Sequence, residues 1–272
     1  MSSNLKLNDE MICVHTIEGK REEGHEIPVP DMRANKPFGI HDQEDDQTAF
    51  FQKLIYAKFD QTKIGIAAPN EISLSLSIST KSKNNAHILR ESIKNNGKKS
   101  DYSLFDKDVK SAYDFLEEIQ KAIVFGYKAV ESFCNASIPD EYIYQKRNGK
   151  GVIEHYGKEQ IERWINTSEK VSSILPSVLD VESPTSEGFW SDFKNLERLR
   201  NEIIHSKSSS TSDILSELFS MKIDDYLLSC LLLLEFFISK DPYNQIFPLG
   251  FGVSQIKVMS VPNADEILSK IE

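Results

Sequence analysis

The chain has 272 residues, of which 39% are apolar and 27% are charged. This is the composition of an ordinary globular protein, and it excludes a disordered or fibrous chain. The formal net charge of −10 at pH 7 excludes a broadly cationic nucleic-acid binder. Any nucleic-acid site must therefore be a local basic patch.

The cysteines and the apolar stretches favour a reducing, aqueous compartment. Cys13, Cys134 and Cys230 are far apart and form no Cys-x-x-Cys pair, so a disulfide framework is not expected. The most apolar run, residues 227–238, is shorter than the roughly 20 residues of a membrane span. The first residues also lack the apolar core of a secretory signal. We therefore expect a cytoplasmic protein that does not contact a membrane.

Residues 1–100 are predicted to form an acidic N-terminal region with little regular structure. Half of the net charge lies in residues 1–60, and we expect residues 1–46 to be extended and irregular. Apolar and polar residues alternate through residues 64–79, which is the period of a half-buried strand, and Pro69-Asn70 favours a turn. We therefore predict a β-hairpin over about 62–80, followed by an irregular connection over 81–103.

Residues 101–240 are predicted to form a helical bundle. Apolar residues recur every three or four positions between Phe105 and Phe133, which indicates a long amphipathic helix that packs on another helix. Further helices are expected over 161–171, ending before Pro176, and over 189–206 and 213–240.

Residues 241–272 are predicted to contribute a strand, at about 252–260, and a tail that pack on the hairpin. The predicted fold class is therefore mainly α (α+β). It consists of a helical bundle and a small antiparallel sheet made from the two flanks of the chain.

The predicted helix over 189–206 contains the residues best suited to chemistry. Arg200 falls inside its apolar stripe, which consists of Phe189, Phe193, Leu196, Leu199, Ile203 and Ile204. A guanidinium in such a place needs a carboxylate, a second chain or an anionic ligand, because desolvating it alone is costly. Asn201 and His205 are four residues apart and lie on one side of the helix, and the helix dipole at this end favours a protonated imidazole.

The sequence Arg200-Asn201-x-x-x-His205, late in a helix that follows a long amphipathic one, resembles the HEPN superfamily of helical-bundle proteins. In that family an arginine, usually followed by a polar residue, precedes a histidine by a short spacer. The resemblance covers about residues 101–240 and includes residues 196–199 and 127–135. The serine-rich segment after His205 lacks the tyrosine through which some toxins of the family are silenced by AMPylation.

The resemblance implies a metal-independent endoribonuclease of the defence or toxin type, without a cofactor. Family members form homodimers in which two motifs line one cleft, and the RNA 2′-hydroxyl attacks the adjacent phosphate. His205 would act as general base or acid, Arg200 would bind the phosphate, and Asn201 would orient one of them. Glu131, on the long helix, would hold Arg200 in place. Candidate RNA-binding residues are Lys194, Arg198 and Lys207, and an inhibitory or activating protein partner is also expected.

The alternative is a catalytically silent HEPN-like interaction module. In that case Arg200 forms a buried ion pair with Glu131 and His205 only ends its helix, although Glu131 can equally well be an exposed carboxylate.

A separate segment of the chain allows two interpretations. His155 and Trp164 lie near Lys146, Arg147 and Lys150, a combination that would suit an RNA-binding edge. A solvated loop followed by a core tryptophan is the interpretation that we favour.

Overall fold

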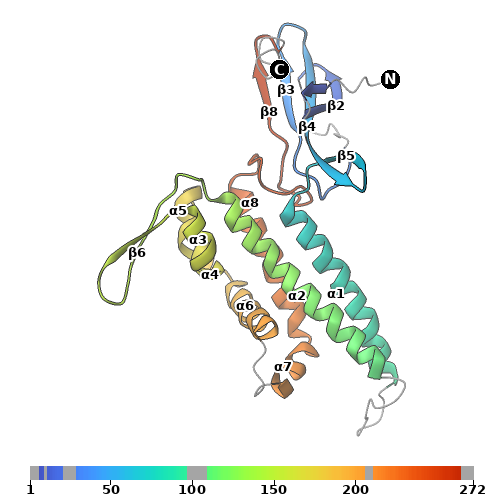
Figure 1. Cartoon of the computed structure of the whole chain (residues 1–272), viewed down its shortest axis with the longest axis vertical. Coiled ribbons are helices and arrows are strands. Elements are labelled where there is room, and N and C mark those ends of the chain that lie inside the picture. The colour runs from blue at the N-terminus through green and yellow to red at the C-terminus, as the bar shows by residue number, and fades with distance from the viewer. Residues whose placement is uncertain (1–5, 9–10, 21–28, 97–108, 206–210, 265–272) are drawn as a thin grey trace. The chain divides into compact units, whose positions relative to one another are not determined.

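The computed structural model describes residues 6–8, 11–20, 29–96, 109–205 and 211–264. The protein contains helices and small sheets, with more residues in helices than in strands (Figure 1). Within these ranges, no helix combines the length and hydropathy that a membrane crossing requires. The chain divides into a sheet unit, residues 1–73 and 238–272, and a helical unit, residues 74–237.

The sheet unit is built from strands of both chain flanks. They are β1 (Lys6–Asn8), β2 (Met11–Glu18), β3 (Phe38–Asp42), β4 (Gln47–Phe59), β5 (Thr62–Ala67) and β8 (Val258–Val261). The strand order is β1-β2-β4-β3-β8, and β5 pairs with the second half of β4. The pair β3–β8 is parallel and the others are antiparallel. The C-terminal strand therefore joins the sheet, but it pairs in parallel with β3 and not with the predicted hairpin over 62–80, and the sheet is mixed rather than antiparallel.

Lys36 explains why the C-terminal strand begins later than the predicted residue 252. Its side chain is 3% exposed, and its ammonium donates hydrogen bonds to the carbonyl oxygens of Pro242 (2.9 Å), Asn244 (3.0 Å) and Gln255 (3.1 Å). These carbonyl groups are held in loops around the ammonium, so Gln255 is not available to a strand ladder.

The prediction of an irregular chain over residues 1–46 is wrong in the described part, which contains β1, β2 and β3. The acidic cluster forms the tight turn between β3 and β4. Asp42 accepts hydrogen bonds from the backbone N–H groups of Glu44 (2.9 Å) and Asp45 (3.3 Å), and Asp46 is left-handed with φ 49°. The aspartates here stabilise an ordered turn, so this acidic cluster is not a solvated coil. Residues 1–5, 9–10 and 21–28 lie outside the described residues.

The predicted hairpin over 62–80 is also wrong beyond its first strand. The hairpin is formed by β4 and β5 around Asp60, which has φ 52°. Helix α1 (Glu71–Asn96) follows, because the Asn70 side chain accepts hydrogen bonds from the N–H groups of Ile72 (3.1 Å) and Ser73 (3.0 Å). This is the geometry of a helix N-cap. The predicted connection over 81–103 is helical through Asn96, and its remainder lies outside the described residues.

Small buried serines explain why the alternating pattern in α1 indicated a strand. Ser75, Ser79 and Ser82 are 1%, 7% and 5% exposed, so polar residues occupy the face that was expected to be apolar. Ser79 donates a hydrogen bond to the carbonyl oxygen of Ala122 (2.8 Å), and a Cβ at Gly126 would lie 3.1 Å from the Ser79 hydroxyl oxygen. The small residues allow α1 to pack closely on the next helix, α2.

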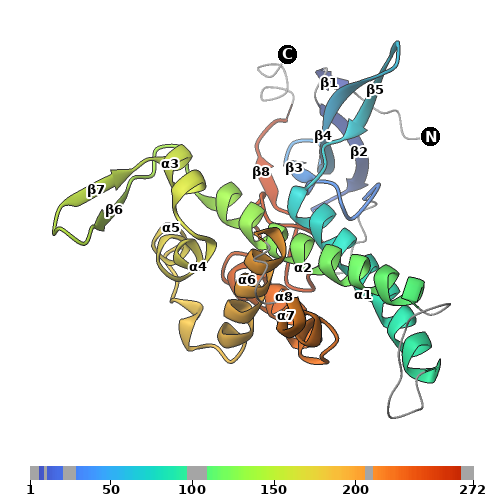
Figure 2. The same cartoon turned by 60° about the horizontal axis from the view of Figure 1, so that its bottom comes forward.

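Helix α2 (Val109–Ser137) confirms the predicted long helix over its described part, and residues 105–108 lie outside it. Aromatic pairs connect α2 to the rest of the unit: Phe115–Phe219 (4.7 Å between ring centroids), Tyr127–Phe193 (6.1 Å) and Phe133–Phe237 (5.8 Å). Figures 1 and 2 show α2 between α1 and the helices that follow it.

The remaining helices differ from the prediction mainly in their breaks. The predicted helix over 161–171 consists of α3 (Lys158–Trp164), α4 (Thr167–Glu169) and the start of the π-helical turn Lys170–Ile174, before α5 (Leu175–Leu179). The predicted helix over 213–240 is divided into α7 (Thr211–Leu218) and α8 (Lys222–Lys240). The Ser220 hydroxyl accepts a hydrogen bond from the Lys222 N–H (3.2 Å), which starts α8 after the break.

The segment before α3 corrects two further expectations. Residues 146–151, interpreted as a solvated loop, belong to a hairpin of β6 (Tyr144–Arg147) and β7 (Ile153–Tyr156). Trp164, interpreted as a core residue, is 64% exposed.

Candidate functional site

Helix α6 (Trp190–Ile204) corresponds to the predicted helix over 189–206 and carries the candidate site. Its side chains Phe193, Leu196 and Leu199 are fully buried, and the Phe193 ring stacks on Tyr127 of α2. Ile204, in the last turn, is 48% exposed. The beginning and middle of α6 are therefore anchored, whereas its last turn faces solvent.

Arg200 is half-buried above α2. Its Nη1 donates a hydrogen bond to the side-chain oxygen of Asn201 (3.0 Å), and its guanidinium carbon lies 5.0 Å from the centre of the Tyr127 ring. The buried Nε–H has no hydrogen-bond partner among the described residues. A buried donor without an acceptor is costly, so this N–H group is suited to an acceptor from a ligand.

His205 follows the last residue of α6, and its side chain is exposed. Its backbone N–H donates to the carbonyl oxygen of Asn201 (2.9 Å), and no hydrogen bond or ion pair of its imidazole occurs with the described residues. His205 is the C-cap of α6 and has non-helical dihedral angles (φ −113°, ψ 46°), so the periodicity of the helix does not fix the direction of its imidazole. The described contacts of Arg200 do not include His205.

Glu131 is half-buried on α2, and the described contacts of Arg200 do not include an ion pair with it. Glu131 instead acts electrostatically on Lys170, which is fully buried and donates hydrogen bonds to the side-chain oxygen of Asn135 (2.9 Å) and the carbonyl oxygen of Glu162 (3.2 Å). Burial lowers the pKa of Lys170, and the negative charges nearby, including Glu131, partly oppose this effect.

The three candidate RNA-binding residues are in different situations. Lys194 donates a hydrogen bond to the Ser168 hydroxyl (2.8 Å) and pairs with Glu197. Arg198 pairs with Glu202 (3.0 Å) and also with Glu217. Lys207 lies outside the described residues.

Glu197 is the residue of this site that the sequence analysis missed. It is 8% exposed, and it accepts hydrogen bonds from the Tyr127 hydroxyl (2.9 Å), from the backbone and hydroxyl of Ser168, and from Lys194. Burial raises the pKa of Glu197, but the hydrogen bonds outweigh it, and the net pKa is lowered from its ordinary value. The Glu197 carboxylate, on α6, therefore connects this helix to Tyr127 of α2 and to Ser168 of α4. Tyr127 also links Glu197 to Arg200, because its hydroxyl donates to Glu197 and its ring contacts the guanidinium.

Replacing Glu197 with Gln should destabilise the protein at pH 7 by about 1.5–3 kcal/mol, because four donor groups lose a charged acceptor. The pKa of Glu197 is lower in the folded protein than its ordinary value of 4.5. The stabilisation is therefore fully present above pH 4.5 and is lost as the pH falls through the pKa of the folded state. Urea unfolding should therefore show a difference from the wild type that shrinks between about pH 5 and pH 3. The exposed Glu159→Gln variant is the control and should show little difference at either pH. A difference for Glu197→Gln that is constant with pH would contradict the assignment.

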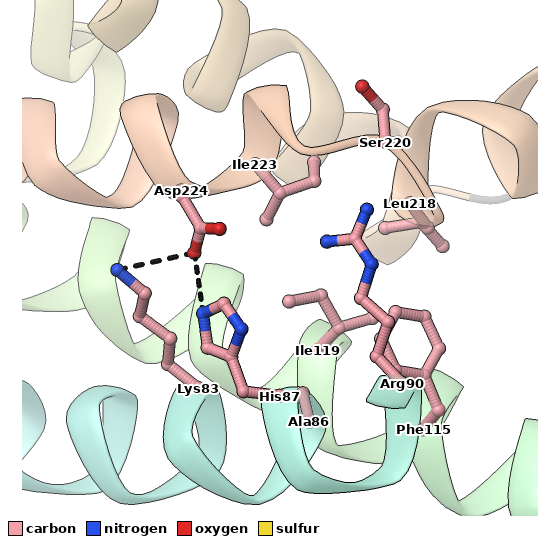
Figure 3. Close-up of a pocket in the computed structure, with 10 residues that line it drawn as sticks. All are labelled: Lys83, Ala86, His87, Arg90, Phe115, Ile119, Leu218, Ser220, Ile223 and Asp224. Carbon is pink, nitrogen blue, oxygen red and sulfur yellow. Dashed lines mark hydrogen bonds and ion pairs between the residues drawn. The ribbon is translucent and has the colours of Figure 1, made fainter. Parts of the chain in front are cut away.

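A second cluster of charged residues lies between α1 and the start of α8, at a small pocket (Figure 3). Asp224 accepts from His87 (2.9 Å) and Lys83 (3.2 Å), and Arg90 donates to the carbonyl oxygen of Phe219 (2.7 Å). The pocket interior of about 10 Å³ has room for no more than a water molecule. Lys83 and His87 pair with Asp224, and Arg90 bonds to a backbone carbonyl, so these side chains already have partners within the protein. We therefore do not assign a ligand to the pocket.

Among the described residues, no three His, Cys, Asp or Glu side chains form a group that could hold a metal ion. Comparisons of the chain with protein-family models, with curated proteins and with solved structures find no match. The function must therefore be argued from the site itself.

Proposed function

We propose that this protein is a metal-independent endoribonuclease of the HEPN type, acting in the cytoplasm in defence or as a toxin. The observation that supports it best is the arrangement at the end of α6. Arg200 is held by Asn201 and Tyr127 with an unsatisfied N–H group, and His205 is exposed one turn after Asn201.

The proposed reaction is transesterification of RNA. The 2′-hydroxyl oxygen attacks the adjacent phosphorus, and the bond from phosphorus to the 5′-oxygen breaks. The products are a 2′,3′-cyclic phosphate and a 5′-hydroxyl. A histidine takes the proton from the attacking hydroxyl and a second one gives a proton to the leaving oxygen. Arg200 stabilises the charge that develops on the phosphate oxygens, while Asn201 fixes the guanidinium by its hydrogen bond.

The proposed reaction favours a homodimer. It uses one histidine as base and another as acid, and each chain offers one His205 at this site, so a second copy of α6 would face the first. The helical unit offers apolar surface for such an interface: Ile204 is 48% exposed on α6, and Leu228, Leu231 and Leu232 are 46%, 37% and 37% exposed on α8.

The packing of α1, α2, α6 and α8 supports a HEPN-like helical bundle. The long helix α2 contacts α6 through Tyr127 and Phe193, and it contacts α8 through Phe133 and Phe237. This is the arrangement that the resemblance implies, with the Arg–His motif late in a helix next to the long one.

One observation favours the second candidate, a silent interaction module. Lys194 and Arg198, two cations beside the motif, are already paired with carboxylates of the chain. An RNA backbone therefore meets fewer available positive charges on α6 than the sequence suggested.

The experiment that tests the proposal is incubation of the full chain with total tRNA and mRNA in EDTA, followed by mapping of the cut ends. Cleavage that leaves 2′,3′-cyclic phosphate and 5′-hydroxyl ends, by a protein that is a dimer in light scattering, is the expected result. A dimer that does not cut RNA would favour the silent module, and cleavage that stops in EDTA would contradict the mechanism.

A further inference from the structure

Trp164 is an exposed aromatic side chain on the helical unit. It is the last residue of α3 and is 64% exposed, and its ring meets Tyr156 of β7 edge-on, 6.4 Å between centroids. Tryptophan combines a large apolar ring with an N–H donor, which is why it is enriched at binding interfaces.

Cations without an ion-pair partner lie near Trp164. Residues 142–166 contain five basic and three acidic residues, and the flanking Asp140, Glu141 and Glu169 offset this excess. Lys146 and Lys158 are paired with Glu169 and Asp140. The other cations, Arg147, Lys150 and Arg163, are exposed and form no ion pair with the described residues. Among the described residues, these three cations are more available to a ligand than Lys194 and Arg198 of α6, which are paired with carboxylates.

The hairpin is fixed to the helices by one of its faces. Glu169 of α4 accepts hydrogen bonds from the Tyr144 hydroxyl (3.0 Å) and the Lys146 ammonium (2.6 Å). The neighbouring Ser168 donates to Glu197 of α6, so a continuous set of contacts connects the hairpin to the helix that carries Arg200.

The other face of the hairpin is open. Its exposed side chains come from the cross-strand pairs Gln145–His155 and Arg147–Ile153. Figure 2 shows the hairpin extending away from the helices of its unit.

We infer that the β6–β7 hairpin and α3 form a binding site for single-stranded RNA. Unpaired bases stack on Trp164, which contacts Tyr156 on the face of the hairpin opposite Arg147. The phosphates contact Arg163 next to Trp164, and the strand continues past Lys150 in the turn to Arg147 on the open face. This inference rests on the proposed function and deepens it, because the site holds the substrate through contacts separate from the Arg–His motif. Base-paired RNA keeps its bases stacked on one another, so it offers Trp164 no free face.

The test is RNA binding measured by fluorescence anisotropy in EDTA, with full-length His205→Ala protein so that the RNA stays intact. The probes are a labelled 12-nucleotide oligouridine and an RNA duplex of equal length. Tighter binding of the single strand is expected. Trp164→Ala should weaken binding by about 10-fold or more, and Trp164→Phe should restore most of it because it keeps a stacking face.

Charge reversal supplies a second, independent variant. Arg147→Glu with Lys150→Glu should weaken binding by about 10-fold or more and reduce its dependence on salt. The matched control, Lys58→Glu with Lys110→Glu, makes the same charge change at exposed residues of β4 and α2 and should leave affinity within about 2-fold.

Each outcome decides between the two proposals. If the His205→Ala protein does not bind the oligouridine, or if adding Trp164→Ala leaves the binding unchanged, the RNA site is wrong. If the protein with His205 restored cuts RNA and Trp164→Ala cuts it equally well, the site is wrong and the nuclease stands. If RNA binds through Trp164 but the protein with His205 does not cut it, the nuclease is wrong and the site stands.

Discussion

Replacing His205 with alanine should reduce RNA cleavage by about 10²–10⁴-fold, the usual contribution of a general acid–base group. The fold should persist, because the imidazole is exposed and makes no hydrogen bond or ion pair with the described residues. A surface truncation of this kind changes stability by no more than about 0.5 kcal/mol. Cleavage rates with a defined RNA in EDTA, together with thermal unfolding, measure both expectations.

His205→Asn is the matched variant for this experiment. Asparagine retains a polar side chain at the helix end but does not titrate, so it should be as inactive as His205→Ala. Both variants should remain dimers in light scattering. Wild-type cleavage by purified His205→Ala protein would rule out His205 as the acid–base group, even if the wild type cuts RNA.

The helices that could be predicted are those whose buried faces are large and apolar. The three- to four-residue spacing in α2 corresponds to buried residues such as Phe115, Ile119 and Phe133. The apolar stripe of α6 was equally clear, because Phe193, Leu196 and Leu199 are buried side chains of ordinary core type. In both helices, hydrophobicity and burial agree.

Helix α1 could not be predicted in the same way because its buried face contains serines. Close packing of α1 on α2 requires small side chains, and a buried serine can satisfy its hydroxyl by bonding to a carbonyl, as Ser79 does with Ala122. Hydropathy alone ranks serine as a surface residue, so the pattern was assigned to a strand. The N-cap at Asn70 was visible in the sequence, but Pro69-Asn70 was interpreted as a turn.

The sequence predicted the helix that carries the candidate site but not the contacts of the residues in that site. Arg200 was expected to need a partner such as Glu131, whereas its described contacts are Asn201 and the face of Tyr127. Glu197 lies four residues after the buried Phe193, and this spacing alone would have placed its carboxylate on the buried side. The partners of that carboxylate come from α2 and α4, which no local pattern in α6 could indicate.

Replacing Arg200 with lysine should reduce cleavage by about 10²–10³-fold, because lysine keeps the positive charge but loses the planar fork that contacts two phosphate oxygens. The lysine can still lie over the Tyr127 ring, and among the described residues Arg200 forms no ion pair that the substitution would break. Thermal stability should therefore change little.

Two further variants separate the role of Arg200 in catalysis from its role in packing. Arg200→Ala should be as inactive as Arg200→Lys and should lose about 0.5–2 kcal/mol of stability, the worth of a cation–π contact. Tyr127→Phe keeps the ring under Arg200 and removes the hydroxyl that donates to Glu197 (2.9 Å), so it should lower stability more than cleavage. Cleavage by Arg200→Lys at the wild-type rate would show that the guanidinium does not act on the phosphate. Its half-buried position would then reflect packing on α2 alone.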